Sequence, residues 1–328
     1  MQMFYQQEKQ VALQAVSAAA QLCEQVRRSQ SSLAIAKPDR SPVTIADFGA
    51  QAIICQALAA AFPEDPVVGE EDSSLLQQPE MADRLAQVTH YVKSQVSSAT
   101  PELVIAWIDR GNGKVSKRYW TLDPIDGTKG YVRGDQYAIA LALVEEGEVK
   151  LGVLGCPALP LDLERPDINI GTIFVGVRTQ GTTMTSLSGG QSNLIRVAKS
   201  DRLESRRLVE SVESSHGNIT LQAAVAREVG LDLPSLHIDS MAKYGLVARG
   251  EAALYIRLPF PLSSPQRENI WDHAAGAIVV EEAGGRVTDM HGHPLDFSCG
   301  STLNNNQGII ATNGEIHEAV LAAVSKLA

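Results

Sequence analysis

The sequence predicts an α/β fold in two lobes, in which helices cover partly antiparallel sheets. In the middle of the chain, apolar runs of strand length are joined by short turns that contain glycine, as in antiparallel hairpins. Beyond about residue 190, strand and helix patterns alternate more regularly. Hydrophobic residues make up 44% of the 328 residues, which is enough for a large packed core. We therefore expect an N-terminal α+β lobe at 1–190 and a C-terminal α/β lobe at 191–328.

The N-terminal part predicts two helices. Residues 5–28 place four apolar side chains on one helical stripe. These are Val11, Ala15, Leu22 and Val26. A second helix opens at Thr44, which can cap it, and Asp47 stands three residues later, at the acidic position of a capping box. This helix runs to about Phe62, because the next residue is proline. Residues 73–100 are polar and partly helical, so we expect them at the periphery.

The middle of the chain predicts a series of strands. Short apolar runs bounded by turn signals favour strands over helices. These runs lie at 104–108, 119–122, 137–144, 149–154, 173–177 and 182–187. The short polar segments at 145–148 and 179–181 join the last four runs into two hairpins.

In the last third of the chain, strands and helices alternate. Strand patterns fall at 194–198, 208–212 and 253–258. Helix patterns fall at 218–229, at 239–250 and from Asp272 onward. The last of these helices ends at Gly284-Gly285, because a glycine pair is a common C-terminal cap.

Composition and charge exclude several classes of function. The net charge is −10 and basic residues do not cluster, so we expect no polymeric nucleic acid as a partner. No apolar run approaches 18 residues and no secretory leader is evident, so we expect a cytoplasmic protein without a membrane span. The cysteines are too far apart for a zinc-binding CxxC pair, and we expect them to be reduced and mostly buried. They are Cys23, Cys55, Cys156 and Cys299.

The strongest chemical signal is the segment 120–128. Here Asp123 and Asp126 stand three residues apart at the end of an apolar strand, and Thr128 opens a helix whose free N–H groups suit an anion. Two carboxylates and the backbone carbonyl of Ile125 make a reasonable set of Mg²⁺ ligands. Taken alone, the segment is also explained by a strand-to-turn corner with Asp123 as a helix cap.

Two further acidic sites change this balance. Glu70 follows a short apolar run and begins a cluster of three acids, for which a solvated loop is the plain alternative. Asp272 follows Trp271 at the start of an apolar helix, where it could be an ordinary N-cap. A carboxylate that caps a helix can also face a metal ion, so the two interpretations of Asp272 are compatible.

Together these motifs resemble the signatures of the inositol monophosphatase superfamily. They occur in the same order as in that superfamily, and the resemblance covers nearly the whole chain. They are Gly69-Glu70-Glu71, Asp123 to Thr128, and Trp271-Asp272 with Gly284-Gly285 downstream. The resemblance implies a layered α-β-α-β-α sandwich of the sugar-phosphatase type. It also implies about two to three Mg²⁺ ions per site, with Asp123 bridging two of them. The implied ligands are Glu70, Asp123, Asp126, Asp272 and the carbonyl of Ile125. Asp47 and Thr128 would orient and deprotonate the attacking water.

Further segments resemble the 3′(2′),5′-bisphosphate nucleotidase branch of that superfamily. They are Ser41 to Asp47, Thr128 to Tyr137, Val212 to His216, Asp239 to Gly250, and Tyr255 to Pro259. The resemblance implies that Lys243, Arg257 and Ser240 hold a second phosphate, and that His216 contacts the adenine or ribose. These residues and Asp272 would lie in the C-terminal lobe, and the other metal ligands in the N-terminal lobe. For each, a surface or capping role is the plain alternative.

The expected activity is hydrolysis of adenosine 3′,5′-bisphosphate, the by-product of sulfate transfer, to AMP and phosphate. The resemblance further implies that 3′-phosphoadenylyl sulfate is a substrate and that lithium or excess calcium inhibits. One alternative is the same metal chemistry on inositol 1,4-bisphosphate or inositol monophosphate. Another is a nucleotide or metal sensor without catalysis. We expect a small-molecule substrate as the partner of a monomer or homodimer.

Overall fold

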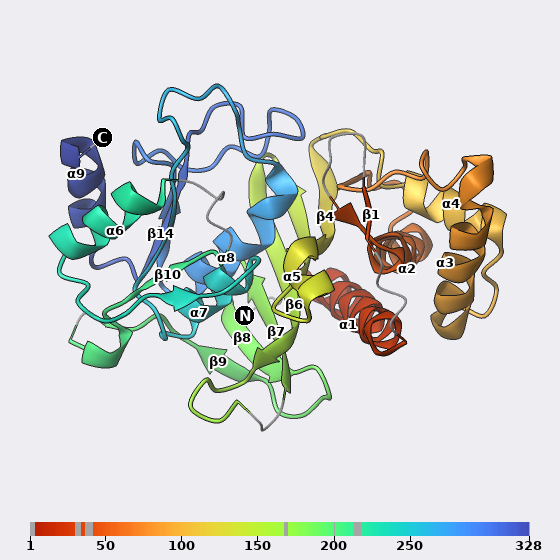
Figure 1. Ribbon diagram of the computed structural model, residues 1–328, viewed down its shortest axis with the longest axis horizontal. Coiled ribbons are helices and arrows are strands. Elements are labelled where there is room, and N and C mark those ends of the chain that lie inside the picture. The colour runs from red at the N-terminus through yellow and green to blue at the C-terminus, as the bar shows by residue number, and fades with distance from the viewer. Residues whose placement is uncertain are drawn as a thin grey trace.

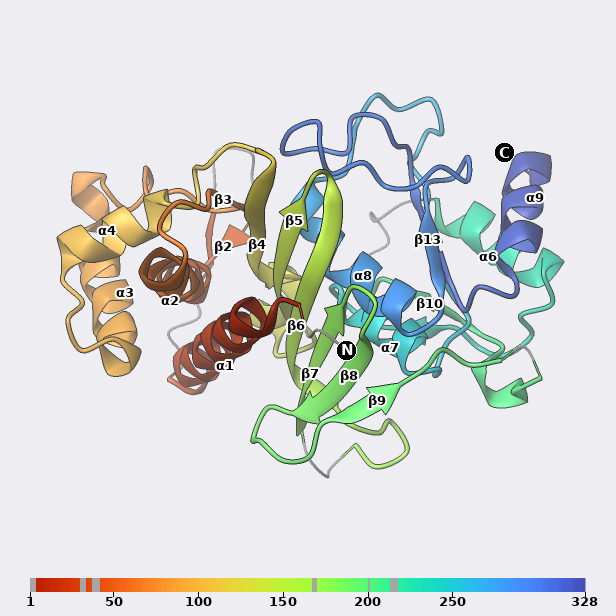
Figure 2. The ribbon, with the colours of Figure 1, turned by 180° about the vertical axis from the view of Figure 1, so that it is seen from behind.

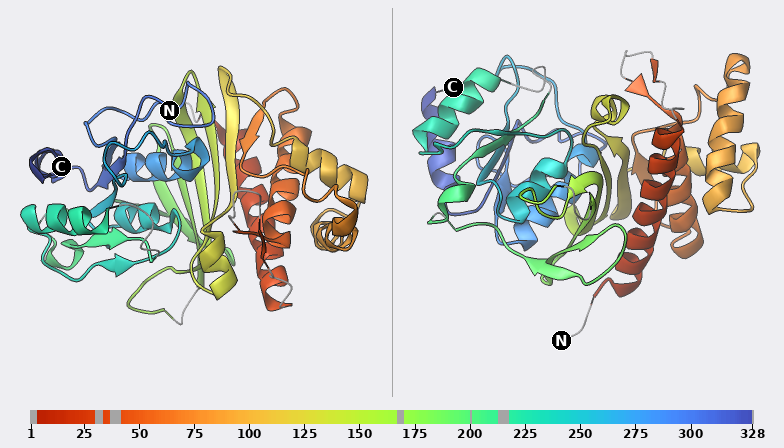
Figure 3. Two further views of the ribbon diagram at one scale, coloured as in Figure 1. Left: turned by 45° about the horizontal axis from the view of Figure 1, so that its top comes forward. Right: turned by 60° about the horizontal axis from the view of Figure 1, so that its bottom comes forward.

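The computed structural model describes residues 4–29, 34–36, 42–166, 170–199, 201–212 and 218–327. Helices and sheets lie in five alternating layers (Figures 1 and 2). α1 and α2 cover one face of a large sheet, and α7 and α8 lie between that sheet and a smaller one. α6 and α9 cover the outer face of the smaller sheet (Figure 3). This order confirms the predicted α-β-α-β-α sandwich.

Among the residues described, the large sheet has seven strands in the order β3-β4-β5-β6-β7-β8-β9. They are β3 (Val67–Gly69), β4 (Arg118–Asp126), β5 (Ala138–Glu145), β6 (Glu148–Pro160), β7 (Ile170–Val177), β8 (Gly181–Ser186) and β9 (Asn193–Ile195). β3 is parallel to β4, and the other neighbours are antiparallel. The β5–β6 and β7–β8 pairs are the two predicted hairpins.

In the part of the chain that the structure describes, the small sheet has five strands in the order β11-β10-β12-β14-β13. They are β10 (Leu208–Glu210), β11 (Leu236–His237), β12 (Leu254–Arg257), β13 (Arg286–Thr288) and β14 (Ile309–Thr312). β10 is parallel to both of its neighbours, whereas β14 is antiparallel to β12 and β13. A short ribbon pairs β1 (Ile35–Ala36) with β2 (Pro42–Val43).

The helices are α1 (Gln6–Arg28), α2 (Ile45–Ala61), α3 (Ala82–Gln95), α4 (Pro101–Asp109), α5 (Thr128–Arg133), α6 (Ile219–Glu228), α7 (Ala242–Ala248), α8 (Ala274–Glu282) and α9 (His317–Leu327). The predicted capping box opens α2: Ala46 N donates to Thr44 Oγ1 at 3.1 Å, and Thr44 N donates to Asp47 Oδ2 at 2.7 Å. Within the described ranges, no helix is long and apolar enough to cross a bilayer.

The predicted strand at 104–108 is wrong, because these residues belong to α4. Thr100 caps this helix by accepting a bond from Leu103 N at 3.3 Å, and Pro101 occupies its first turn. Val104 and Ile108 stand four residues apart, so one helical face carries both into the core. A run of five residues is too short for its period to separate a strand from a buried helix.

β9 extends the large sheet to Ile195, which is beyond the predicted lobe boundary. It pairs with β8 in register with Thr182 to Met184, so the segment at 193–195 is a strand of the large sheet. The division at residue 190 stays a prediction.

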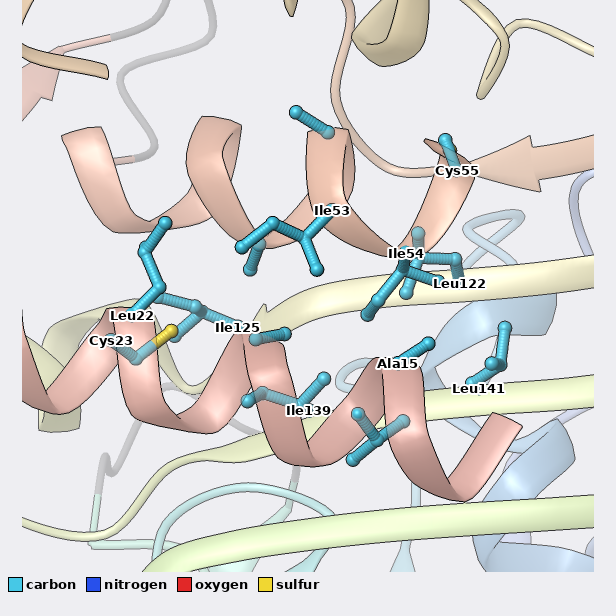
Figure 4. Packing of buried hydrophobic residues seen from close by; sticks show 14 of the residues in the cluster. Ala15, Leu22, Cys23, Ile53, Ile54, Cys55, Leu122, Ile125, Ile139 and Leu141 are labelled. Carbon is cyan, nitrogen blue, oxygen red and sulfur yellow. The ribbon is translucent and has the colours of Figure 1, made fainter. Parts of the chain in front are cut away.

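α1 and α2 pack against the large sheet and fix the position of β4 (Figure 4). Ile54 of α2 lies beside the sheet residue Leu122, whereas Leu22 and Ile53 lie between the two helices, and all four side chains are almost fully buried. This core holds the end of β4, where the acidic motif lies.

The four cysteines are free thiols, of which Cys299 is exposed and the other three are buried.

Candidate active site

A β-bulge at the end of β4 brings the two acids of the central motif to one face of the sheet. Asp123 is opposite Ala140 and Asp126 is opposite Ala138, so three steps on β4 match two steps on β5. A strand without the bulge would point residues three apart to opposite faces. Ile125 N donates to Asp123 Oδ1 at 3.0 Å, which fixes the Asp123 side chain.

Glu70 reaches the same edge from the neighbouring strand. β3 is parallel to β4, so the carboxyl ends of the two strands meet. Glu70 N donates to the carbonyl of Leu122 at 3.1 Å, and the charge of Glu70 helps to raise the pKa of Asp123, so the two carboxylates lie close together. The next residue, Glu71, is fixed through its backbone, because its N–H donates to Gln51 Oε1 at 3.1 Å and its carbonyl accepts a bond from Gln51 Nε2. Glu70 therefore joins the cluster from the end of β3.

Thr128 and Asp47 meet beside the carboxylates, although they are 81 residues apart in the chain. Thr128 Oγ1 lies 3.3 Å from Asp47 Oδ1 and 3.2 Å from the carbonyl oxygen of Ile125. The other oxygen of Asp47 accepts bonds from the backbone N–H of Thr44 and from its hydroxyl, at 2.7 and 2.6 Å. The capping box of α2 therefore orients the Asp47 carboxylate toward Thr128.

Asp272 completes the acidic group from a 3-10 turn, Ile270–Asp272, which contacts β4 and β5. The interpretation of Asp272 as the N-cap of the following helix is wrong. His273 occupies that position, and its side chain makes no capping bond. The extra turn separates Asp272 from the helix, so its carboxylate belongs to the cluster instead of the cap.

The carboxylates of this cluster are buried and repel one another. Burial, followed by the charges of Glu70, Asp126 and Asp272, raises the pKa of Asp123 well above its ordinary range. Burial and the neighbouring carboxylates also raise the pKa of Asp272. Burial raises the pKa of Asp126 too, although Lys243 partly offsets it. Four such oxygen donors are stable as anions only with cations among them, so the group fits hard divalent ions such as Mg²⁺.

Lys243 and Ser240 approach the cluster from the start of α7. Met241 N donates to Asp126 Oδ2 and joins this segment to the end of β4. Lys243 is only 4% exposed, its Nζ donates to the carbonyl of Ile238 at 3.3 Å, and burial lowers its pKa to about 8. Ser240 has φ 71°, and its Cβ lies 3.1 Å from the position of a Cβ added to Gly127. The glycine is thus needed where the two segments touch.

Arg257, at the end of β12, is held by a residue that the sequence motifs did not single out. Its Nε lies 3.0 Å from Glu268 Oε1, and its Nη2 lies 2.9 Å from Glu268 Oε2. Burial opposes ionisation of Glu268, but Arg257 and His273 outweigh it and lower its pKa to about 2. Glu268 lies in a loop without a periodic pattern, and only its position four residues before Asp272 could have drawn notice.

His216 lies outside the described residues, so its predicted contact with the nucleotide stays a prediction. The chain is described again from Asn218, whose N–H donates to the carbonyl of Leu258 at 3.1 Å. Leu258 directly follows Arg257. The structure brings together the other predicted site residues from both sheets: Asp47, Glu70, Asp123, Ile125, Asp126, Thr128, Ser240, Lys243, Arg257 and Asp272.

Comparison with known proteins shows the family of the chain. Residues 4–328 match the model of the Inositol monophosphatase family. The chain belongs to the inositol monophosphatase family. It is 41% identical to a 3′(2′),5′-bisphosphate nucleotidase of Schizosaccharomyces pombe, over 98% of this chain and 96% of that protein. It is also 41% identical to a rice protein of the same name, over 98% and 94%. Membership of this family makes the chain an enzyme of the phosphatase class.

Solved structures of the family share the fold at low identity. The structure of an IMPase from Thermotoga maritima matches with a TM-score of 0.67 at 22% identity, and each chain covers 98% of the other. CysQ from Bacteroides thetaiotaomicron, described as a bacterial member of the inositol monophosphatase family, matches with a TM-score of 0.59 at 19% identity. This match covers 95% of the present chain and 98% of CysQ.

Proposed function

We propose that the chain is a magnesium-dependent phosphomonoesterase that hydrolyses adenosine 3′,5′-bisphosphate to AMP and phosphate. The observation that carries this proposal is the contact between two unlike groups. Met241 N donates to Asp126, so the carboxylate cluster and the segment with Lys243 touch. One group suits a phosphate bound through cations, and the other suits a phosphate bound directly. The names of the fission yeast and rice relatives support the same substrate class.

Divalent cations would be held by Glu70, Asp123, Asp126, Asp272 and the carbonyl of Ile125. When bound, they would neutralise the charge of the scissile phosphate and acidify the attacking water. Burial and then mutual repulsion raise the pKa values of Asp123 and Asp272, and these shifts support the assignment because a bound cation would offset both causes.

Thr128 and Asp47 would handle the proton of the attacking water. The Thr128 hydroxyl can accept this proton while it donates its own to Asp47 Oδ1, 3.3 Å away. Thr44 holds the other oxygen of Asp47 with two bonds, so the carboxylate cannot turn away from Thr128. This arrangement needs no nucleophilic serine or cysteine and no phosphoenzyme.

Lys243, Arg257 and Ser240 would hold the phosphate that is not cleaved. A buried ammonium gains more from a phosphate than an exposed one does, because less water screens the pair. Such a site favours substrates with a second anionic group. 3′-Phosphoadenylyl sulfate, which carries its 5′ charge on a longer group, is a proposed second substrate.

Phosphate release from adenosine 3′,5′-bisphosphate at saturating Mg²⁺ tests the proposal. We expect turnover that chelation with EDTA abolishes and that Mg²⁺ restores. Faster release from an inositol phosphate would change the proposed substrate and leave the proposed metal chemistry in place. Release from none of these compounds would favour a sensor.

A further inference from the structure

The guanidinium of Arg257 is held at two points by one carboxylate. Two of its nitrogens meet both oxygens of Glu268, at 3.0 and 2.9 Å. Its charge also acts on the hydroxyl of Tyr255, and Lys243 Nζ lies 5.4 Å from the centroid of that tyrosine ring. Tyr255 is thus the common neighbour of the two cations that we assign to the second phosphate.

Glu268 is held in turn by a chain of buried groups. His273 Nε2 lies 3.5 Å from Glu268 Oε2, and His273 Nδ1 lies 2.7 Å from the hydroxyl of Tyr244. His273 is 1% exposed and Tyr244 is fully buried, so this ring has little freedom to turn. Tyr244 directly follows Lys243 in α7. The same helix therefore anchors both the lysine and, through His273, the partner of the arginine.

Arg257 also has a competing partner close by. One oxygen each of Glu268 and Asp272 and one nitrogen of His273 all lie within 4.8 Å of one another. Arg257 and Asp272 attract each other electrostatically, as do Arg257 and Asp126. An arginine fork on the Asp272 carboxylate would be a strong pair, but it would occupy oxygens that a divalent cation needs. Two nitrogens of the Arg257 guanidinium already bond to Glu268, so Arg257 gains less by pairing with Asp272.

We propose that Glu268 is a positioning residue that keeps Arg257 in the second-phosphate subsite and off the metal-binding carboxylate Asp272. This inference rests on the proposed function for its substrate arm, and only on the carboxylate cluster for its metal arm. Glu268 itself would not bind the metal, because Arg257 engages both of its oxygens.

The test compares Glu268→Gln with the wild type. The amide keeps the size of the side chain and one acceptor for Arg257, but it loses the charge that balances the fork. With Arg257 free to pair with Asp272, we expect Mn²⁺ binding without substrate, measured by electron paramagnetic resonance, to weaken about tenfold. We expect the KM for adenosine 3′,5′-bisphosphate to rise about tenfold and kcat at saturating Mg²⁺ to fall less than about threefold.

Three further variants make the result specific. Glu268→Asp keeps the charge and should bind Mn²⁺ within about threefold of the wild type. The double variant Arg257→Met/Glu268→Gln removes the competitor and should recover the Mn²⁺ affinity. Glu251→Gln is the matched control, because Glu251 has the same 23% side-chain exposure and pairs with Arg249 at 2.6 Å, outside the cluster. Glu251→Gln should change neither the Mn²⁺ affinity nor the KM for adenosine 3′,5′-bisphosphate.

Two outcomes would overturn the inference. Mn²⁺ affinity and bisphosphate KM that both stay unchanged in Glu268→Gln would show that Arg257 needs no such partner. An Mn²⁺ affinity that is lost in Glu268→Gln and not recovered in the double variant would make Glu268 a metal ligand. If the wild type does not cleave the bisphosphate, the proposed function fails, yet the Mn²⁺ measurements still decide the role of Glu268.

Discussion

Replacement of Lys243 by methionine should separate the two phosphate subsites. Methionine keeps most of the length of the buried stem and removes the ammonium, so the packing against Tyr255 changes little. Lys243 is 4% exposed, and its Nζ donates to the carbonyl of Ile238 at 3.3 Å, its one hydrogen bond to a described residue. A bound phosphate would therefore gain a charge-assisted bond in a poorly screened site.

Such a bond contributes about 1.5–3 kcal/mol. Its loss corresponds to a decrease of about 10- to 150-fold in kcat/KM for adenosine 3′,5′-bisphosphate. Inositol 1-phosphate has no second phosphate, so its kcat/KM should fall less than about threefold. The assay is phosphate release at saturating Mg²⁺ with both substrates. Lys326→Met, on the surface and paired with Glu228, is the matched control and should leave both values unchanged.

The same lysine predicts a pH dependence. Burial lowers the pKa of Lys243 to about 8, so its ammonium is present below that pH and is lost above it. The KM for the bisphosphate should therefore rise as the pH increases from 7 to 9, and Lys243→Met should lack this rise. Equal losses with the two substrates, or a bisphosphate KM that does not change, would refute the assignment of Lys243 to the second phosphate.

Three other predictions concern the cluster and the core. Asp126→Asn should abolish turnover with an unchanged circular dichroism spectrum, because asparagine still accepts the bond from Met241 N; retained turnover would remove Asp126 from the metal site. Thr128→Val should lower kcat by about 10²- to 10⁴-fold, because it deletes the hydroxyl that faces Asp47, and Thr128→Ser should recover most of it; equal kcat values for valine and serine would exclude the proton path. His317 is fully buried between two threonine hydroxyls, and burial lowers its pKa to about 4. In the unfolded chain this histidine binds a proton below about pH 6.5, whereas in the folded chain it binds one only near pH 4. As the pH falls from 6.5 to 4, up to about 3 kcal/mol of unfolding free energy should therefore be lost. Urea titrations should show that His317→Gln loses less unfolding free energy than the wild type over this pH range, and equal losses would contradict this prediction.

Local signals in the sequence predicted much of the fold and the candidate site. The Thr44–Asp47 capping box is a property of four consecutive residues, and the β5–β6 hairpin follows from strand patterns on either side of one turn. The acidic motif ends β4 as predicted, because a turn signal follows an apolar run there.

Features that depend on tertiary contacts could not be predicted in the same way. The α4 segment is an apolar run that becomes helical because Thr100 caps it and because the core lies on one side. The bulge that turns Asp123 and Asp126 to one face depends on the register between β4 and β5. The role of Glu268 depends on Arg257, which is 11 residues away and on another element.

A comparison of substrates is the sharpest test of the proposed nucleotidase activity. Phosphate release should be measured with Mg²⁺ from adenosine 3′,5′-bisphosphate, inositol 1-phosphate and inositol 1,4-bisphosphate, each with and without lithium. We expect that release from the nucleotide is the fastest and that lithium inhibits it. Faster release from either inositol phosphate, or no release from the nucleotide, would contradict it.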